Sequence, residues 1–414
     1  MRDTELYRHL LGLVSPWTVG RVELAVKEQR VNVWAEHEPE VRWPCPQCGA
    51  SLALYDHSEE RVWRHLDSCQ FMTFLHARPP RVNCPDHGVL QIKLPWAEPN
   101  ARFTTLFERL AIEVLREASV LGATRILRIS WYEAWHIMKR AVARGLRAKQ
   151  KKVVTTIGVD EKAIAKGAQY MTIVCDLDAS TVEYVSEDRR VESLDGYFKG
   201  LSSKQLAGIE AVAMDMWEPY FRSTLAHVPK AVDKIVFDTY HIMTYMNKAV
   251  DTVRRQENRS RLAARDETLL GTRFMWLYAA ENLPDRHREK FTALMKQNLK
   301  TGRAWSIKES LRDLWGCVSH AEGVRHWKSW WGWASRSRLK PVIDAGLTVK
   351  RHLHNVLTYF KHRITNATSE GINSKIQTIK KAAYGFRNKE NFKTAIFFHC
   401  GGLQLYPVTH GNLR

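Results

Sequence analysis

Two short turns of similar form constrain the fold of this 414-residue chain more than any other feature of its sequence. One turn reads PCPQCG and carries Cys45 and Cys48, and the other reads NCPDHG and carries Cys84 and His87. Each turn places two metal-binding side chains on one tight loop, and its glycine accepts the backbone conformation that closes the loop. The pair predicts a tetrahedral site for one zinc ion. Four protein ligands leave no open coordination position, so we expect this zinc to be structural rather than catalytic.

Other side chains in the same segment compete for the metal. Cys69 lies between the two turns and is the main rival ligand, with His57 and His65 as weaker rivals. A small core side chain is the alternative role for Cys69. In a chain that starts without a signal-peptide pattern, the seven cysteines are expected as ligands or core residues rather than as disulfides.

The composition points to a soluble protein with a polyanionic partner. Lys and Arg number 63 against 44 Asp and Glu, which gives a net charge of +19. Such an excess attracts nucleic acid through long-range electrostatics and counterion release. An acidic membrane surface is the competing partner, but neither end carries a basic amphipathic anchor, and no apolar run is long enough to span a bilayer. We therefore expect a cytoplasmic protein of several domains that binds nucleic acid and no membrane.

Residues 101–150 have the layout of a helix-turn-helix. Thr105 and Glu108 have the spacing of a capping box that opens a helix through Ala118, and a second short helix follows over 119–127. Ser130 and Glu133 form another capping box, which starts a third helix through Ala143. The exposed faces of that helix offer DNA contacts, with phosphate contacts in the basic run behind it, from Trp131, Tyr132, Glu133, His136, Lys139, Arg140, Arg144 and Arg147. A plain helical hairpin followed by a solvated linker is the alternative.

From Val153 the pattern changes to strands. The apolar run VVTTIGVD predicts a strand that ends at Asp160, and YMTIVCDLD and VEYVSED predict two more. A helix then leads to GIEAVAMDM, which ends at Asp215, and another to a fifth strand, KIVFDTYHIM, with Asp238 inside it. These elements indicate a mixed α/β sheet. Asp160 and Asp215 are expected at the ends of adjacent strands, where two carboxylates can share a pair of metal ions.

The remaining sequence is helical in pattern. Residues 249–350 are basic and rich in tryptophan, and their WKSWWGW cluster is either core or a surface that stacks on unpaired bases. Asn366 or Thr368 then caps a helix that carries Glu370 in its first turn. Asn373, Gln377 and Lys381 follow on the same side of this helix. Alone, Glu370 would only complement the helix dipole; with Asp160 and Asp215 it predicts a third metal-binding acid.

Four stretches of the chain resemble one known group of proteins. IGVDE, AMDMWEPY, FDTYH and NATSEGINSKIQTIKKAAYGFRN are similar to motifs of the DDE transposases of bacterial insertion sequences. Within that group the chain resembles the insertion-sequence L-three family, whose members also carry N-terminal zinc knuckles and a helix-turn-helix. The likeness covers nearly the whole chain, and the stretch from Asn366 to Asn388 is its most specific motif. His87 departs from it, because a cysteine is more usual there.

The resemblance implies an enzyme of DNA transposition. It assigns Asp160, Asp215 and Glu370 as a catalytic triad that binds two Mg²⁺ or Mn²⁺ ions in an RNase H-like core. Such an enzyme binds the terminal repeats of its element, cleaves DNA at the element ends and joins the 3′-hydroxyl ends to target DNA. The resemblance further implies a homodimer or larger synaptic assembly, and a bacterial, nucleoid-associated location. Further DNA contacts are expected from Asn373, Gln377, Lys380, Lys381 and Arg387.

The sequence leaves alternative roles for two accessory residues, Asp238 and His241. Asp238 is a rival for the second carboxylate. His241 positions a phosphate or water, or is a packed core histidine.

The predicted architecture is multidomain α/β, an RNase H-like mixed-sheet core interrupted by a helical insertion and preceded by zinc-binding and helix-turn-helix domains. Its boundaries are 1–40 for an N-terminal helix and hairpin, 41–98 for zinc binding, 101–150 for the helix-turn-helix, 153–248 and 351–414 for the core, and 249–350 for the insertion. A catalytically silent DNA-binding regulator derived from such an enzyme is the alternative function, and a plain RNase H-like nuclease is a third.

Overall fold

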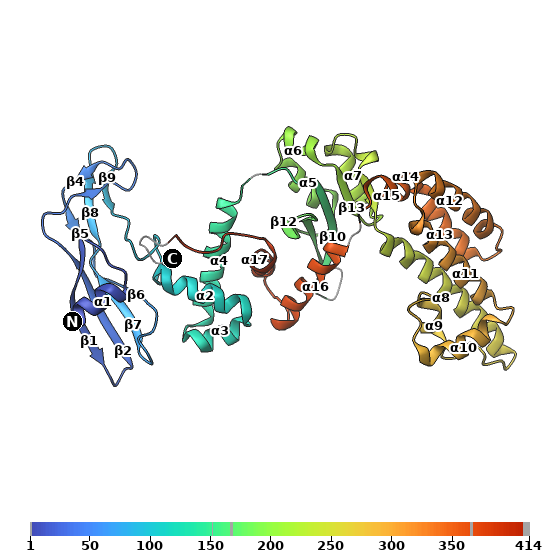
Figure 1. Cartoon of the computed structure of the whole chain (residues 1–414), viewed down its shortest axis with the longest axis horizontal. Helices are drawn as coiled ribbons and strands as arrows, with labels where there is room; N and C mark the ends of the chain where they lie inside the picture. Colours follow the sequence, from blue (N-terminus) through green and yellow to red (C-terminus); the bar gives the residue numbers. More distant parts are fainter. Residues whose placement is uncertain (1, 151, 166–168, 365–366, 409–414) are drawn as a thin grey trace. The chain divides into compact units, whose positions relative to one another are not determined.

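The computed structural model describes residues 2–150, 152–165, 169–364 and 367–408, and the chain forms two compact units (Figure 1). The first unit is Met1–Gln150 together with Phe397–Arg414, and the second is Lys151–Ile396. The C-terminal segment thus belongs to the same unit as the first 150 residues. In the described part of the chain, no helix is long and apolar enough to cross a membrane.

The first unit begins with a β-rich region. After α1 (Asp3–Leu10), β1 (Trp17–Ala25) and β2 (Arg30–His37) form the predicted antiparallel hairpin. β7 (Met72–Ala77) adds parallel to β2, and β6 (Arg61–Arg64) adds antiparallel to β7. Two small sheets pair β3 (Trp43–Pro44) with β4 (Ser51–Leu52), and β5 (Asp56–His57) with β8 (Pro80–Cys84) and β9 (Gly88–Gln91). Segments on both sides of the predicted boundary at residue 40 therefore share one sheet. The bounds of the six predicted segments stay a prediction.

Three helices follow in the first unit: α2 (Thr105–Glu117), α3 (Val120–Leu127) and α4 (Trp131–Ala148). The Ser130–Glu133 capping box is confirmed, because the Ser130 hydroxyl accepts from the Glu133 N–H and the Glu133 carboxylate accepts from the Ser130 N–H. The predicted Thr105–Glu108 capping box is wrong, because the helix is capped one residue earlier. Thr104 is the N-cap of α2, and its hydroxyl accepts from the Phe107 N–H at 3.3 Å. α4 also runs five residues beyond its predicted end, so part of the basic run is helical.

The second unit contains a five-stranded mixed sheet in the order β12-β11-β10-β13-β14. Its strands are β10 (Thr156–Ala165), β11 (Gln169–Asp176), β12 (Thr181–Glu187), β13 (Ala211–Met214) and β14 (Ile235–Phe237). β10, β11 and β12 are antiparallel to one another, whereas β13 and β14 run parallel to β10. The sheet connections contain α5 (Val191–Lys199), α6 (Ser203–Gly208), α7 (Glu218–His227) and the short η1 (Ala231–Asp233). The predicted mixed α/β sheet is confirmed.

Two strand predictions need correction. β10 does not end at Asp160 but continues for five residues, because β11 pairs with it as far as Ala165. β14 ends at Phe237 rather than running through KIVFDTYHIM, because Asp238 caps a helix that starts at Thr239.

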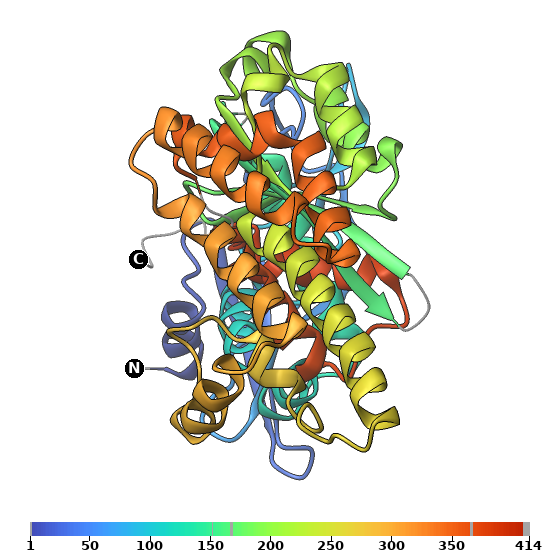
Figure 2. The same cartoon turned by 90° about the vertical axis from the view of Figure 1, so that its right-hand side faces the viewer.

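A long run of helices separates β14 from the last two helices of the chain. They are α8 (Thr239–Ala263), α9 (Arg273–Leu277), α10 (Asp285–Met295), α11 (Lys300–Arg312), η2 (Asp313–Gly316), α12 (His320–Ser335), α13 (Lys340–Arg351), α14 (Leu353–Leu357) and α15 (Tyr359–His362). α8 packs against α11 and α13, and Figure 2 shows it lying alongside its neighbours. Trp327 and Trp330 of the WKSWWGW cluster are buried and Trp333 is exposed, so most of this cluster is core.

The chain closes with α16 (Ala367–Ala382) and α17 (Lys389–Cys400). Thr368 lies inside α16 and is not its cap, and Asn366 lies outside the described residues.

Candidate active site and DNA-binding elements

The two cysteine turns meet in the first unit. The ligand atoms of Cys45, Cys48, Cys84 and His87 all lie within 4.8 Å of one another, and the Cys48 and Cys84 sulfurs are 3.7 Å apart. That sulfur separation equals the edge of a tetrahedron around an ion with Zn–S bonds of about 2.3 Å. Backbone N–H groups of Cys48 and Gln47 lower the pKa of Cys45 to about 6, which favours the thiolate that binds zinc. The donor set therefore fits a structural zinc.

The rival zinc ligands lie elsewhere. His65 is buried, and its Nδ1 is 2.9 Å from the Thr104 hydroxyl that caps α2. His57 pairs with His37, with 2.8 Å between their Nε2 atoms. Cys69 is exposed and not in the core. Within the described residues, the metal-binding cluster thus consists of the four predicted side chains.

The N-terminal half of α4 presents an exposed surface. Trp131, Tyr132, His136 and Lys139 are exposed, and Ala134, Trp135 and Met138 bury the opposite face against the helices before it. Tyr132 is 80% exposed, which is unusual for a residue with so much apolar surface. This is the arrangement expected of a recognition helix, whose N-terminal residues reach base edges.

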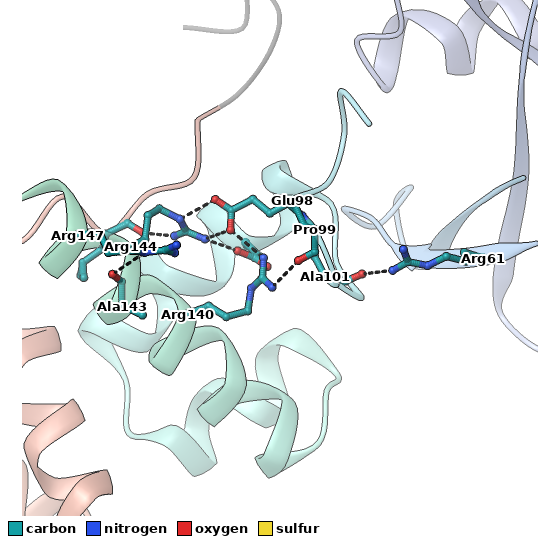
Figure 3. Close-up of polar contacts among 10 residues, drawn as sticks. Arg61, Glu98, Pro99, Ala101, Arg140, Ala143, Arg144 and Arg147 are labelled. Atoms are coloured by element: carbon teal, nitrogen blue, oxygen red, sulfur yellow. Dashed lines mark hydrogen bonds and ion pairs between the residues drawn. The ribbon is translucent and has the colours of Figure 1, made fainter. Parts of the chain in front are cut away.

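Two predicted DNA contacts on α4 have other partners. Arg140 and Arg144 are not on the exposed face, because both turn toward Glu98 (Figure 3). The closest approaches to Glu98 are 2.8 Å for each arginine, and Arg144 also lies 2.9 Å from Glu108. Arg144 further donates to the Leu405 carbonyl, which ties the C-terminal segment to α4. Sequence reasoning missed this cluster because Glu98 and Glu108 lie far from α4 in the chain.

Three aspartates fall in one row across the sheet of the second unit. Gly158 of β10 is paired with Ala213 of β13, and Ala213 is paired with Val236 of β14. Asp160 lies two residues further along β10, and Asp215 and Asp238 lie one residue beyond the ends of β13 and β14. Adjacent strands are about 4.8 Å apart, and residues two apart return to the same face. The register therefore brings the three carboxylates together at one edge of the parallel pairing.

Electrostatic coupling within this row agrees with its geometry. Burial raises the pKa of Asp215 to about 6; the charges of Glu161 and Asp160 add to the rise, and His241 opposes it. Burial also raises the pKa of Asp160, with Asp238 and Glu161 adding to it. His241 is thus close to both carboxylates, and its Nε2 lies 3.8 Å from Asp238. Each ionised carboxylate makes ionisation of its neighbours less favourable. A divalent cation bound among them would relieve this repulsion.

α16 lies directly against β10. The Asn373 amide donates to the Asp160 carboxylate, and Lys162 of β10 donates to the Asn373 carbonyl at 3.1 Å. A Cβ atom on Gly158 would lie 2.3 Å from the Ser369 hydroxyl, so glycine is needed for this close approach. Glu370 follows Ser369, stands one turn before Asn373 on α16, and is exposed.

The other residues predicted on α16 differ in exposure. Lys380 donates to the Ala163 carbonyl at 3.0 Å, which directs it to the β10 backbone. Lys381 and Arg387 are exposed, and Gln377 is half-buried.

One part of this site was not predicted. The Arg189 guanidinium lies between the rings of Tyr170 and Trp217, 4.1 and 4.5 Å from their centroids, and pairs with Glu161 at 3.0 Å. The Trp217 indole donates to the Arg189 carbonyl, and its backbone N–H donates to Asp215 at 3.1 Å. Arg189 therefore braces the loop that carries Asp215. The only sequence signal was the proximity of Trp217 to Asp215 in AMDMWEPY.

A family profile described as a transposase of the ISL3 group matches residues 157–396, which is more than half of the chain and includes Asp160, Asp215, Asp238 and Glu370. The chain belongs to the ISL3 family of transposases. Two further profiles match: the zinc finger of the IS204, IS1001, IS1096 and IS1165 transposases over residues 42–87, and the helix-turn-helix domain of family ISL3 over residues 92–142. The zinc-finger match contains all four residues of the cysteine and histidine cluster.

Curated relatives cover most of the chain. The transposase of insertion sequence element IS1557 from Mycobacterium tuberculosis is 26% identical over 423 residues, covering 94% of each chain. The transposase of IS1001 from Bordetella parapertussis is 26% identical over 354 residues, covering 84% of this chain and 86% of the relative. The expected family is therefore confirmed.

Proposed function

We propose that this ISL3 transposase binds the terminal repeats of its own insertion sequence, cleaves DNA at the element ends and joins the 3′-hydroxyl ends to target DNA. The single observation that carries the proposal is the in-register row of Asp160, Asp215 and Asp238, next to the helix with Glu370. The order of three antiparallel strands followed by two parallel ones supports an RNase H-like core. The helices between β14 and α16 then form its insertion.

The donor set fits Mg²⁺ or Mn²⁺. Asp160 and Asp215 are partly buried carboxylates in mutual electrostatic contact, and carboxylate oxygens are the protein ligands that these ions prefer. Asp160 and Asp215, with Glu370, would hold two ions. When bound, such a pair activates the attacking water and stabilises the leaving oxygen of the scissile phosphate.

The chain's own side chains then set the geometry of the site. The Asn373 amide holds one oxygen of Asp160, and the Trp217 N–H holds one oxygen of Asp215, so each carboxylate keeps its orientation. His241, whose Nε2 lies 3.8 Å from Asp238, would supply a proton donor or acceptor to a bound phosphate. Lys381 is exposed at the far end of α16 and is suited to a DNA phosphate.

DNA recognition is assigned to the first unit. Trp131, Tyr132, His136 and Lys139 would face the terminal repeat, with Arg147 on phosphate, because these α4 side chains are exposed. Arg140 and Arg144 would instead hold α4 in place. Pairing of two element ends calls for a homodimer or larger assembly, which the resemblance implies.

The proposal is tested by separating the two candidates for the second acid. Asp215→Ala and Asp238→Ala are compared with wild type for Mg²⁺-dependent nicking of a labelled duplex that carries the terminal repeat. Asp215→Ala should abolish nicking and leave duplex binding intact, while Asp238→Ala should keep measurable nicking. Loss of nicking in Asp238→Ala alone would move the second ligand to Asp238. Binding without nicking in wild type, in Mn²⁺ as well, would favour the silent regulator.

A further inference from the structure

The positive charge of the chain is concentrated in its helical region. Residues 239–362 carry 23 Lys and Arg against 11 Asp and Glu, a net charge of +12 out of the +19 of the whole chain. This is nearly two-thirds of the excess in less than one-third of the residues. Neither the zinc cluster, the α4 surface nor the row of acids draws on this charge.

A surface hollow of about 500 Å³ lies within that region. It is bounded by the second half of α8 and by the starts of α11 and α13. Four cationic side chains line it: Arg261, Lys300, Arg338 and Lys340. The volume exceeds that of about ten water molecules, so the hollow can admit more than one phosphate group.

The two acids of the hollow are already satisfied by the protein. Glu257 accepts from the backbone N–H groups of Lys300 and Thr301, at 2.9 and 2.7 Å, and so caps α11. Asp266 accepts from the Thr268 N–H at 2.9 Å and pairs with Arg261. Both carboxylates pair with Arg261 and keep their charge, so the four cations and two acids leave the lining with a net charge of +2.

Two cations of the lining are without an ion-pair partner among the described residues. Lys300 and Arg338 are exposed, and within the described residues neither lies within ion-pair distance of an acid. Lys340 pairs with Asp344 at 3.1 Å, but both are exposed, and exposed pairs are weak. A ligand with several phosphates would supply the missing negative charge.

The residue types of the lining distinguish between possible phosphate ligands. None of the described side chains that line the hollow is aromatic, so the hollow offers no surface for base stacking. Sequence-independent contact with a phosphate backbone needs only cations at a suitable spacing. We propose that the hollow between α8, α11 and α13 binds the sugar-phosphate backbone of duplex DNA through residues distinct from those of α4 and from the carboxylates. This inference rests on the proposed DNA-transposing function.

The test compares two charge reversals on the full-length protein. The first variant combines Lys300→Glu with Arg338→Glu. The matched control combines Arg286→Glu with Lys290→Glu, two exposed cations of α10 that do not line the hollow. Binding to a duplex of unrelated sequence is measured over a series of KCl concentrations. Because each phosphate contact contributes about 0.9 to the salt slope, the hollow variant should lose about 2 from the slope and at least about tenfold in affinity. The control should lose much less.

Equal losses in both variants would show that only the overall charge matters and would overturn the site, as would no loss in either. An equal loss of affinity for single-stranded RNA of the same length would overturn the assignment to duplex DNA. Lys300→Gln with Arg338→Gln, checked by circular dichroism, provides the same comparison if the reversed pair does not fold. Nicking by wild type is scored separately, so failure of the proposed function and failure of this site give different results.

Discussion

Two clusters of buried charge in this protein are built on opposite principles. In the first unit, Glu98 and Glu108 each contact both Arg140 and Arg144, so every acid is matched by cations. In the second unit, Glu161 pairs with Arg189, but its neighbours Asp160 and Asp215 have no arginine or lysine ion-pair partner among the described residues. Asp160 accepts from the Asn373 amide, and Asp215 accepts from the Trp217 N–H. Matched charges fix a structure, and unmatched like charges mark a place for an added cation. On this comparison we propose that the first cluster is structural and the second functional.

The largest effect is expected in the unmatched cluster. Asp215→Asn keeps the acceptor for the Trp217 N–H but removes a metal ligand, so Mg²⁺-dependent cleavage should fall by about 10³-fold or more. The same change removes repulsion between buried carboxylates. The free energy of unfolding in EDTA at pH 8 should therefore rise by about 1–3 kcal/mol. Nicking assays and urea denaturation measure the two quantities, and a loss of both activity and stability would contradict a functional cluster.

The matched cluster should respond in the opposite sense. Arg144→Met leaves Glu98 and the buried Glu108 to share one arginine, Arg140, so the first unit should lose up to about 3–5 kcal/mol of unfolding free energy. Urea denaturation followed by tryptophan fluorescence measures this loss. Arg147→Met on the same helix is the control, since Arg147 is exposed and donates only to its own helix at Ala143. Equal unfolding free energies for the two variants would show that Arg144 has no structural role.

His65 adds a third case to the comparison of buried ionisable groups. It is kept neutral instead of being paired with an opposite charge. Burial, together with the neighbouring Arg64 charge, lowers the pKa of His65 from 6.5 to about 4. A lowered pKa means that the unfolded chain binds the proton more tightly, so this stability is present above pH 6.5 and is lost as the pH falls toward 4. Between pH 7 and pH 5 the loss should be about 2 kcal/mol. His65→Gln should show a shallower pH dependence in urea denaturation, and an unchanged slope would refute this role.

The smallest effect is expected from an exposed charge beside the matched cluster. Lys139 precedes Arg140 on α4 but is exposed. Lys139→Ala should change stability by less than about 0.5 kcal/mol and should lower the salt slope of terminal-repeat binding by about 1. Fluorescence anisotropy over a salt series measures this change. Unaltered DNA binding would remove Lys139 from the recognition surface.

Local features of this protein could be predicted from the sequence. The cysteine turns and the Ser130–Glu133 box depend on residues within a few positions of one another, and both were located correctly. Thr104 and Thr105 show the limit of such patterns, because either threonine could cap α2 by its type. The side chain of Glu108 is buried and pairs with Arg144, so it does not cap α2 as the sequence pattern predicted.

Features set by strand pairing or distant partners could not be predicted. β10 continues past Asp160 because β11 returns along it, and no local signal marks that extension. Even so, the parallel register with β13 ends near Asp160, so the expected neighbourhood of Asp160 and Asp215 agrees with the geometry. Arg140 and Arg144 looked like DNA contacts because their acidic partners lie 32 or more residues earlier in the chain. The catalytic roles of the individual acids and the six domain boundaries remain predictions.

We propose that Asp160, Asp215 and Glu370 together make a metal-dependent DNA-cleaving site. The most direct test is nicking of a labelled duplex that carries the source element's terminal repeat, in Mg²⁺, by wild type and by Glu370→Gln. Wild type should nick at the element boundary, and the variant should bind the duplex equally well without nicking it. Nicking by Glu370→Gln at the wild-type rate would contradict the account, because the reaction would then proceed without the third acid.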